Sequence, residues 1–241
     1  MNAIVTDRLT KKYNNITAVD NLNLTVEQGE LFALLGVNGA GKTTTVKMLS
    51  CLIKPTSGDA FLLDDSIISA PHEIKGKINI SPQETAVAAN LSVLENLEFT
   101  AGIYGQNRDT AKIKAYEIAR KFGLENELSK KVKHLSGGMQ RRLSIAMALI
   151  TEPRILFLDE PTLGLDVLSR RELWSSIREL KGKVTIILTT HYMDEVEILS
   201  DRVGIMARGK LVAIGTVAEL TMRTGTSKLE DAFVELVGGA A

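Results

Sequence analysis

One run of the chain has the residue types and the spacing of a phosphate-binding loop. The run Gly36-Val37-Asn38-Gly39-Ala40-Gly41-Lys42-Thr43 fits G-x-x-x-x-G-K-[ST] at every position, and Thr44 follows it. Its glycines let backbone amides point inward at phosphate oxygens, and the N-terminus of a following helix adds positive potential. Lys42 would place its charge on the β- and γ-phosphates, and the Thr43 hydroxyl could bind Mg²⁺. An ordinary glycine-rich turn would leave both side chains unexplained.

Two carboxylates follow an apolar run and could supply the chemistry of hydrolysis. Asp159 and Glu160 come directly after Ile155–Leu158. Asp159 would then end a strand, where it can bind Mg²⁺ directly or through water. Glu160 could act as the base that orients or activates an attacking water. Acidic residues after a strand are also common in plain loops, so this assignment depends on the phosphate-binding loop being present.

A third run could form a second anion site. Ser136, Gly137 and Gly138 open a predicted helix, so a serine hydroxyl, free amides and the helix dipole would meet at one point. An ordinary serine cap followed by flexible glycines explains this run equally well when it is taken alone. A chain with two phosphate sites, however, needs a reason for the second.

The strands and helices that must position these residues follow from the apolar pattern. Continuous apolar runs at Leu31–Leu35, Ile155–Leu158 and Val184–Leu188 predict strands buried on both faces. Helical spacing predicts helices over 41–52 and 168–180. Because strand and helix alternate, we expect right-handed crossovers in a mainly parallel sheet, and therefore an α/β fold.

The middle of the chain, 84–150, shows helical patterns and no clear strand. Ser92 and Glu95 form a capping box, a second helix is predicted from Asp109 to Phe122, and a third begins at Ser136. We therefore expect a helical lobe inserted into the sheet domain.

Further strands and helices are predicted outside the lobe. Alternation from Leu22 to Val26 predicts a strand, and the runs 203–206 and 211–214 predict a hairpin. Near the end of the chain, capped helices are expected to begin at Thr216 and at Ser227.

The net charge, the cysteine count and the apolar segments of the chain exclude several classes of protein. The chain has 241 residues, 44% of them apolar and 24% charged, with a formal net charge of zero. A neutral chain is a poor candidate for nucleic-acid binding, and the single cysteine, Cys51, excludes a disulfide framework or a cysteine-ligated zinc site. The first twelve residues have no apolar signal-peptide core, and no segment reaches the length of a membrane span. If the protein works at a membrane, we expect another chain to cross it.

The run Leu135–Gln140 resembles the signature motif of ATP-binding-cassette (ABC) ATPases, and other motifs of that family occur in order from Ile4 to Leu236. The resemblance implies specific roles. Tyr13 would stack on adenine, and Gln83 would reach Mg²⁺ and the attacking water. The run Pro161–Asp166 would be the D-loop that crosses a dimer interface, with Asp166 at that interface. His191 would contact the γ-phosphate.

The resemblance also implies an architecture. It is a P-loop NTPase fold with a mainly parallel core sheet, an N-terminal antiparallel β subdomain and an inserted helical subdomain. The RecA-like core with its β subdomain would occupy 1–83 and 151–225, the helical subdomain 84–150, and a short C-terminal helix 226–241. ATP and Mg²⁺ would be held between the P-loop of one subunit and Ser136, Gly137 and Gly138 of a second ATPase subunit, identical or related.

The finer resemblance is to ATPase subunits of daunorubicin-resistance and sodium-extrusion exporters. It rests on the runs 39–45, 161–167 and 229–236, although many members continue well beyond the position of Phe233. It implies a peripheral protein on the cytoplasmic face of the membrane, bound to a transmembrane permease and to no nucleic acid. A soluble ABC ATPase that acts without a permease, such as an iron–sulfur assembly ATPase, remains the alternative.

The permease would dock where the helical lobe meets the sheet domain. We expect Ala86, Val87, Leu91 and Val93 to offer an apolar groove to a cytoplasmic helix of the permease. The alternative is that these four residues only pack the lobe.

Overall fold

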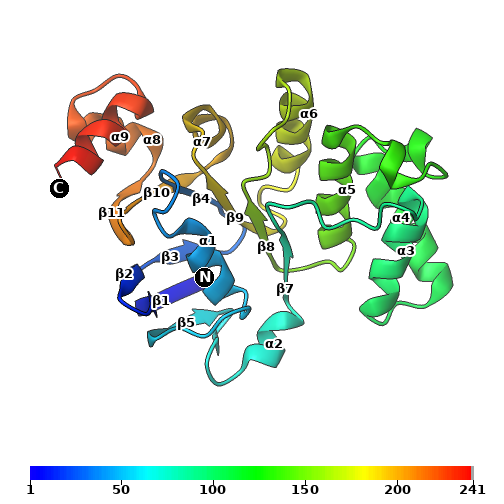
Figure 1. The fold of residues 1–241 in the computed structure, drawn as a ribbon, viewed down its shortest axis with the longest axis horizontal. Coiled ribbons are helices and arrows are strands. Elements are labelled where there is room, and N and C mark those ends of the chain that lie inside the picture. The colour runs from blue at the N-terminus through cyan, green and yellow to red at the C-terminus, as the bar shows by residue number, and fades with distance from the viewer. Residues whose placement is uncertain (240–241) are drawn as a thin grey trace.

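The computed structural model describes residues 1–239, and a six-stranded sheet lies at its centre (Figure 1). The strand order is β11-β10-β4-β9-β8-β7, and every neighbouring pair is parallel except β10 and β11. Parallel strands buried on both faces account for the continuous apolar runs in the sequence. The bounds are β4 (Leu31–Leu35), β7 (Ile78–Ser81), β8 (Ile155–Asp159), β9 (Thr185–Thr190), β10 (Arg202–Ala207) and β11 (Lys210–Gly215).

A second, antiparallel sheet is formed by the N-terminal part of the chain. The strands β2, β5 and β3 each pair with β1, and β6 pairs with β5. The longest strand, β1, was not predicted individually, because register shifts interrupt its pairing with each neighbour. The bounds are β1 (Asn2–Tyr13), β2 (Ile16–Leu22), β3 (Thr25–Glu27), β5 (Ser57–Leu62) and β6 (Asp65–Ser66).

The single strand predicted from Leu22 to Val26 is wrong, because the chain breaks there into the end of β2 and the start of β3. The buried Thr6 hydroxyl donates to Leu22 O and accepts from Leu24 N, both at 2.8 Å. It therefore takes the place of the ladder hydrogen bonds that an unbroken strand would have made.

Helices cover the central sheet and extend beyond its β11 edge. The helix predicted to begin at Ser227 begins at Leu229 instead, with Lys228 at the cap position and no side-chain cap bond. Burial of Leu229, Ala232 and Phe233 holds it in place, since most helical stability comes from packing an apolar face. The bounds are α1 (Lys42–Leu49), α2 (Pro71–Lys75), α6 (Val167–Arg178), α7 (Met193–Leu199), α8 (Val217–Thr224) and α9 (Leu229–Gly238).

The helical lobe lies between β7 and β8 in the chain and stands beside the sheet (Figure 1). It contains α3 (Val93–Ile103), α4 (Arg108–Lys121) and α5 (Gly137–Leu149), with two short 3-10 turns before α5. The capping box of Ser92 and Glu95 forms as expected, whereas α4 is capped by Asn107, two residues before Asp109. No helix in the described part of the chain is both long and apolar enough to cross a membrane.

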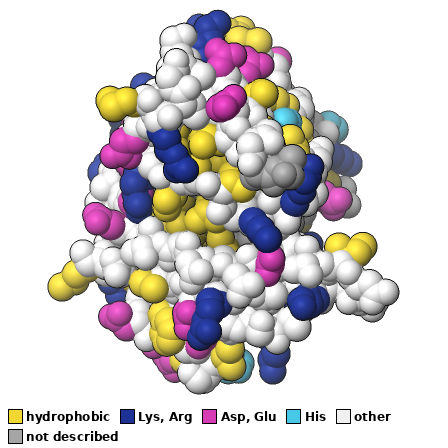
Figure 2. All heavy atoms as spheres, turned by 90° about the vertical axis from the view of Figure 1, so that its left-hand side faces the viewer, with side chains coloured by type: hydrophobic (Ala, Val, Ile, Leu, Met, Phe, Trp, Pro, Cys, Tyr) yellow, Lys and Arg dark blue, Asp and Glu magenta, His cyan; other side chains and the backbone are white. Residues whose placement is uncertain are grey.

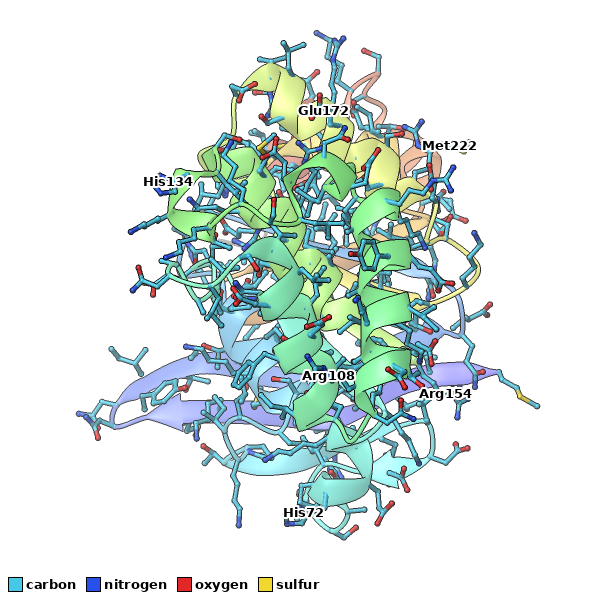
Figure 3. The ribbon with its side chains drawn as sticks, turned by 90° about the vertical axis from the view of Figure 1, so that its right-hand side faces the viewer. His72, Arg108, His134, Arg154, Glu172 and Met222 are labelled. Atoms are coloured by element: carbon cyan, nitrogen blue, oxygen red, sulfur yellow. The ribbon has the colours of Figure 1, made fainter. Side chains whose placement is uncertain are left out.

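The lobe surface differs from the expected apolar groove. Val93 is fully buried and Val87 packs against the same core cluster, so the prediction that Val93 faces a partner is wrong. Ala86 is exposed and Leu91 is half-buried. The large apolar side chains that the lobe exposes along α3 are Phe99 and Ile103. Figure 3 shows the side of the molecule on which the lobe helices lie.

Candidate functional site

The phosphate-binding loop follows β4 and has the backbone shape that its glycines predict. Gly39 and Gly41 have φ values of 81° and 104°, a region that favours glycine. A side chain could not replace the hydrogen of Gly41, because a Cβ there would lie 2.5 Å from Ala18 O. Gly41 caps α1, so the amides of the loop and the N-terminus of that helix converge on one point.

The loop lines a cavity of about 550 Å³ together with residues from four other parts of the chain. Tyr13 comes from the end of β1, Gln83 follows β7, Glu160 follows β8, and His191 follows β9. Parallel strands put their carboxyl ends at one edge of a sheet, which is why residues distant in sequence meet here. The lining residues are Tyr13, Ala18, Asn38, Gly39, Ala40, Gly41, Lys42, Thr43, Thr44, Gln83, Glu160, Leu163 and His191.

Lys42, Glu160 and His191 form a charged group inside this cavity. The Lys42 ammonium donates to Gly36 O at 2.6 Å and to Val37 O at 3.3 Å, and it lies 3.5 Å from Glu160 Oε1. The other carboxylate oxygen, Glu160 Oε2, lies 3.0 Å from His191 Nδ1. Both Lys42 and Glu160 are buried, so each charge depends on the other for neutralisation.

The backbone of Glu160 is held in an uncommon conformation. Its φ is 47°, which is rare for a residue with a side chain and is found disproportionately at functional sites. Its N–H donates to Thr189 O at 3.0 Å and to Thr189 Oγ1 at 3.1 Å. These bonds to β9 fix the direction in which the carboxylate enters the cavity.

An oxygen-rich corner suited to Mg²⁺ lies at the base of α1. The Thr43 hydroxyl is 3.2 Å from Asp159 Oδ1, and the same oxygen accepts from the Thr189 hydroxyl. Hydroxyl, carboxylate and amide oxygens are the ligands that Mg²⁺ takes, usually together with phosphate and water. The described residues hold no cluster of three or more histidine, cysteine or carboxylate side chains.

The second predicted anion site lies elsewhere on the chain. Ser136 caps α5 by accepting from Met139 N at 3.2 Å, and Gly137 is open to solvent. A Cβ on Gly138 would lie 2.7 Å from Ser169 Oγ, so only glycine lets this loop approach α6. None of these three residues lines the cavity described above.

Asp166 begins α6 next to that loop. Its carboxylate accepts from the amides of Leu168 and Ser169, both at 3.0 Å, and from the Ser169 hydroxyl at 2.7 Å. Hydrogen bonding by Ser169 lowers the pKa of Asp166 below its ordinary value. In the single chain, Asp166 is therefore an ionised helix cap beside the signature motif.

Sequence reasoning missed Thr189 and Arg141, which both contact the backbone around the site. Thr189 stands opposite Asp159 in the pairing of β8 with β9, so a threonine inside a fully buried strand was the available signal. For Arg141 the available signal was helical spacing. Arg141 lies three residues after Gly138 and four before Ile145, so it shares the buried face of α5 with them.

Comparisons with known proteins place these features in context. A family model described as "ABC transporter" matches residues 19–163. "Daunorubicin/doxorubicin resistance ATP-binding protein DrrA" of Streptomyces peucetius is 39% identical over 228 residues, which are 94% of this chain and 69% of that protein. "Probable multidrug ABC transporter ATP-binding protein YbhF" of Escherichia coli (strain K12) is 40% identical over 235 residues. The match covers 95% of this chain but only 40% of YbhF.

A solved structure is similar over most of this chain. It is the dimeric structure of an ATP-binding cassette in a post-hydrolysis state, bound to ADP and Pi. The TM-score is 0.81 at 25% sequence identity, and the match covers 89% of this chain and 98% of that one. This likeness confirms the predicted fold class, including the inserted helical lobe.

Proposed function

The chain belongs to the ABC transporter family, and from that premise we propose that it binds Mg-ATP, hydrolyses it in a dimer of ATPase subunits, and thereby powers a separate permease. One observation carries the proposal. The phosphate-binding loop, Gln83, Glu160 and His191 come from four places in the sequence and line a single cavity. Hydrolysis of a triphosphate needs these parts together, namely an anion cradle, a base and a group that senses the terminal phosphate.

Mg-ATP would be bound by the phosphate-binding loop and by side chains around it. The amides of residues 36–44 would surround the phosphates, and Lys42 would exchange Glu160 for the β- and γ-phosphate oxygens. Tyr13 is 46% exposed at the rim of the cavity, and the Lys11 ammonium lies 5.2 Å from the centroid of its ring. The ring would stack on adenine with the face that Lys11 does not cover. Mg²⁺ would be held by Thr43, Asp159 and Gln83, and it would supply charge neutralisation to the phosphates.

Glu160 is then released to act on water. With Lys42 on the phosphates, the Glu160 carboxylate can accept a proton from a water that attacks the γ-phosphorus. The bond to the bridging oxygen breaks, and ADP leaves with that electron pair. His191, whose Nδ1 lies 3.0 Å from Glu160 Oε2, would donate a hydrogen bond to a γ-phosphate oxygen.

The second anion site, formed by Ser136, Gly137 and Gly138, would bind phosphate in a dimer. Ser136, Gly137 and Gly138 would close on the γ-phosphate bound by the other subunit, and Asp166 would lie at the interface. That the similar solved cassette is dimeric with ADP and Pi supports this arrangement. ATP would favour the closed dimer because it contacts both subunits, and hydrolysis would remove the shared contact.

Export is the direction that the relatives favour. The two described above are named for multidrug transport and for daunorubicin/doxorubicin resistance, and neither is named for iron–sulfur assembly. We therefore propose that the chain works at the cytoplasmic face of a membrane with a transmembrane permease, and that the permease selects the solute. The soluble alternative gains no support from these comparisons.

Replacing the proposed base tests the function directly. Purified Glu160→Gln should lose ATP hydrolysis by about 100-fold or more, because an amide cannot accept the proton. It should also form a stable dimer with Mg-ATP, measured by light scattering coupled to gel filtration. Glu179→Gln, at the exposed C-cap of α6, is the matched control and should behave like the wild type.

Two results would count against the proposal. Hydrolysis by Glu160→Gln at the wild-type rate would remove Glu160 from its role as base. A chain that stays monomeric with Mg-ATP, even when co-expressed with its permease, would remove the shared site.

A further inference from the structure

Arg141 is a buried cation whose hydrogen bonds go only to backbone carbonyls. It lies on the second turn of α5, five residues after Ser136, and is 4% exposed. Arginine is almost never fully buried unless it is paired with an acid. No carboxylate lies within ion-pair distance of this guanidinium among the described residues. A cation in such a place requires an explanation.

Its planar head is instead held by four carbonyls from loops around the cavity. Nε donates to Pro161 O and Nη2 to Asp159 O, each at 2.8 Å. Nη1 donates to Pro82 O and also to Gln83 O, the latter at 3.2 Å. Four of the five N–H groups of the fork are thereby used.

These carbonyls belong to the residues on which the proposed chemistry depends. Asp159 and Gln83 are two of the three side chains proposed to hold Mg²⁺. Pro161 directly follows Glu160 and opens the proposed D-loop. One side chain on the signature helix therefore fixes the backbone on both sides of the space where water must attack.

Burial lowers the pKa of this group, and the charges of nearby acids offset only part of the shift. Desolvation lowers the pKa of Arg141 to about 10, while the charges of Asp159 and Glu195 act in the opposite direction. The guanidinium stays protonated at neutral pH, so the fork keeps all of its donors. A side chain placed only for packing would not need a charge at this position.

We propose that Arg141 is a positioning residue for ATP hydrolysis, which ties α5 to the loops that carry Gln83 and Asp159–Pro161. The inference rests on the proposed function and extends it. Arg141 touches neither nucleotide nor water, and it acts by holding Gln83 and the Asp159–Pro161 turn at a fixed separation. Its planar fork matters as much as its charge, since a lysine ammonium offers three donors from one point and cannot span four separate carbonyls.

The test is steady-state ATP hydrolysis by the full chain carrying Arg141→Lys or Arg141→Gln. We expect kcat to fall about 10-fold or more in both variants, while KM for ATP changes less than about threefold, because the phosphate-binding loop is untouched. The Mg²⁺ concentration for half-maximal activity should rise. Arg142→Lys is the matched control, since the neighbouring guanidinium contacts Phe122 O and Glu172 instead (Figure 3 labels Glu172).

A double-mutant cycle separates positioning from a general structural role. If Arg141 acts partly through Gln83, then Arg141→Lys should cost at least threefold less in a Gln83→Ala background than in the wild type. Full additivity would overturn the proposal. A kcat within twofold of wild type in both Arg141 variants would also overturn it. So would a loss of kcat that a lower melting temperature explains completely, or failure of both variants to fold.

These outcomes are distinct from failure of the proposed function. In that case the wild-type chain itself would neither hydrolyse ATP nor dimerise with Mg-ATP. A wild type that does both, with Arg141 variants that match it, would discard the role of Arg141 alone.

Discussion

At the scale of single residues, the Lys42 ammonium already contacts oxygen atoms, and a bound phosphate would replace some of these oxygens with its own. This ammonium is 5% exposed and lies among Gly36 O, Val37 O and Glu160 Oε1. The site therefore keeps its positive charge in position and neutralised before nucleotide arrives. When nucleotide binds, the Lys42 ammonium exchanges the Glu160 carboxylate for phosphate oxygens. Because the ammonium is already buried, binding does not add the cost of desolvating it.

Removal of this ammonium should weaken nucleotide binding itself. Lys42→Ala is expected to raise the Kd for Mg-ATP by about 10- to 100-fold, since a charge-assisted hydrogen bond contributes about 1.5–3 kcal/mol. Isothermal titration calorimetry would measure the change. Lys47→Ala, which removes an exposed lysine from the same helix, is the control and should bind normally. Equal affinities for the two variants would contradict the assignment.

Local sequence patterns predicted the phosphate-binding loop and Glu160 of this cavity, whereas Tyr13, Gln83 and His191 were expected from the family resemblance. The phosphate-binding loop needs glycines and a lysine at fixed spacing, and Asp159 and Glu160 follow an apolar run. Thr189 and Arg141 escaped because their importance depends on pairing between distant segments. No spacing along one strand or helix shows which carbonyl or carboxylate a neighbouring element will present.

At the scale of elements, α6 and α7 are joined by a buried polar contact. Trp174 Nε1 on α6 donates to Glu195 Oε1 on α7 at 3.1 Å, and Glu195 is fully buried. The Arg170 guanidinium lies over the rings of Trp174 and Tyr192, 5.3 and 5.6 Å from their centroids, and pairs with Asp194 at 3.4 Å. Because Asp166 caps α6 and His191 precedes α7, these contacts tie the segment proposed as the D-loop to the segment that carries His191.

The buried carboxyl of this contact should make stability depend on pH. Burial raises the pKa of Glu195, Asp194 raises it further, and Thr190, Trp174 and Thr162 oppose the shift. Above the ordinary value of 4.5, the unfolded chain releases a proton that the folded chain retains, so stability falls as pH rises toward the raised pKa.

Glu195→Gln removes this ionisation while keeping an acceptor for Trp174. The variant should melt at a higher temperature than wild type at pH 8, and the difference should shrink as pH approaches 4.5. Circular dichroism melts across that range would measure it. The exposed Glu179→Gln should change the melting temperature by the same small amount at every pH. A difference for Glu195→Gln that does not vary with pH would refute the account.

Elements with a strong local signal were predicted well, and those set by tertiary contacts were not. The capping boxes at Ser92 and Thr216 place α3 and α8 correctly. In contrast, α9 begins two residues after its expected cap, because burial of its apolar face decides its position. The strand break after Leu22 depends on Thr6, which lies sixteen residues earlier.

At the scale of the whole molecule, the helical lobe and the opposite face around α8 and α9 expose different arrangements of apolar and charged side chains. The lobe exposes Phe99 and Ile103 on α3, and Ile113 on α4. The opposite face carries α8 and α9, with hydrophobic side chains in a hollow and charges of both signs around it (Figure 2). Because the lobe surface near α3 continues from the segment after Gln83, we expect the permease to contact it there.

Charged substitutions on this surface should separate docking from folding. Ala86→Glu and Phe99→Glu should keep the melting temperature and ATP hydrolysis of the wild type, yet abolish co-purification with the permease. Val93→Asp should instead lower stability by more than about 3 kcal/mol, because it buries an unpaired charge. Met222→Glu, on the exposed α8 side chain that Figure 3 labels, should leave co-purification intact. Unfolding of Ala86→Glu and Phe99→Glu would show that these residues only pack the lobe.

The way the lobe is attached restricts how it can turn. The chain leaves β7 after Ser81 and returns at Ile155, which pairs with Ile78. The two attachments are therefore offset by three residues, about 10 Å along the strand direction. Rotation about the line through these two points leaves both attachments in place, and the hydrogen bonds of Arg141 to Pro82 O and Gln83 O lie next to its β7 end. The lobe should accordingly swing about an axis close to the strands, so that Ser136 travels along an arc and its approach to a partner depends on a single angle.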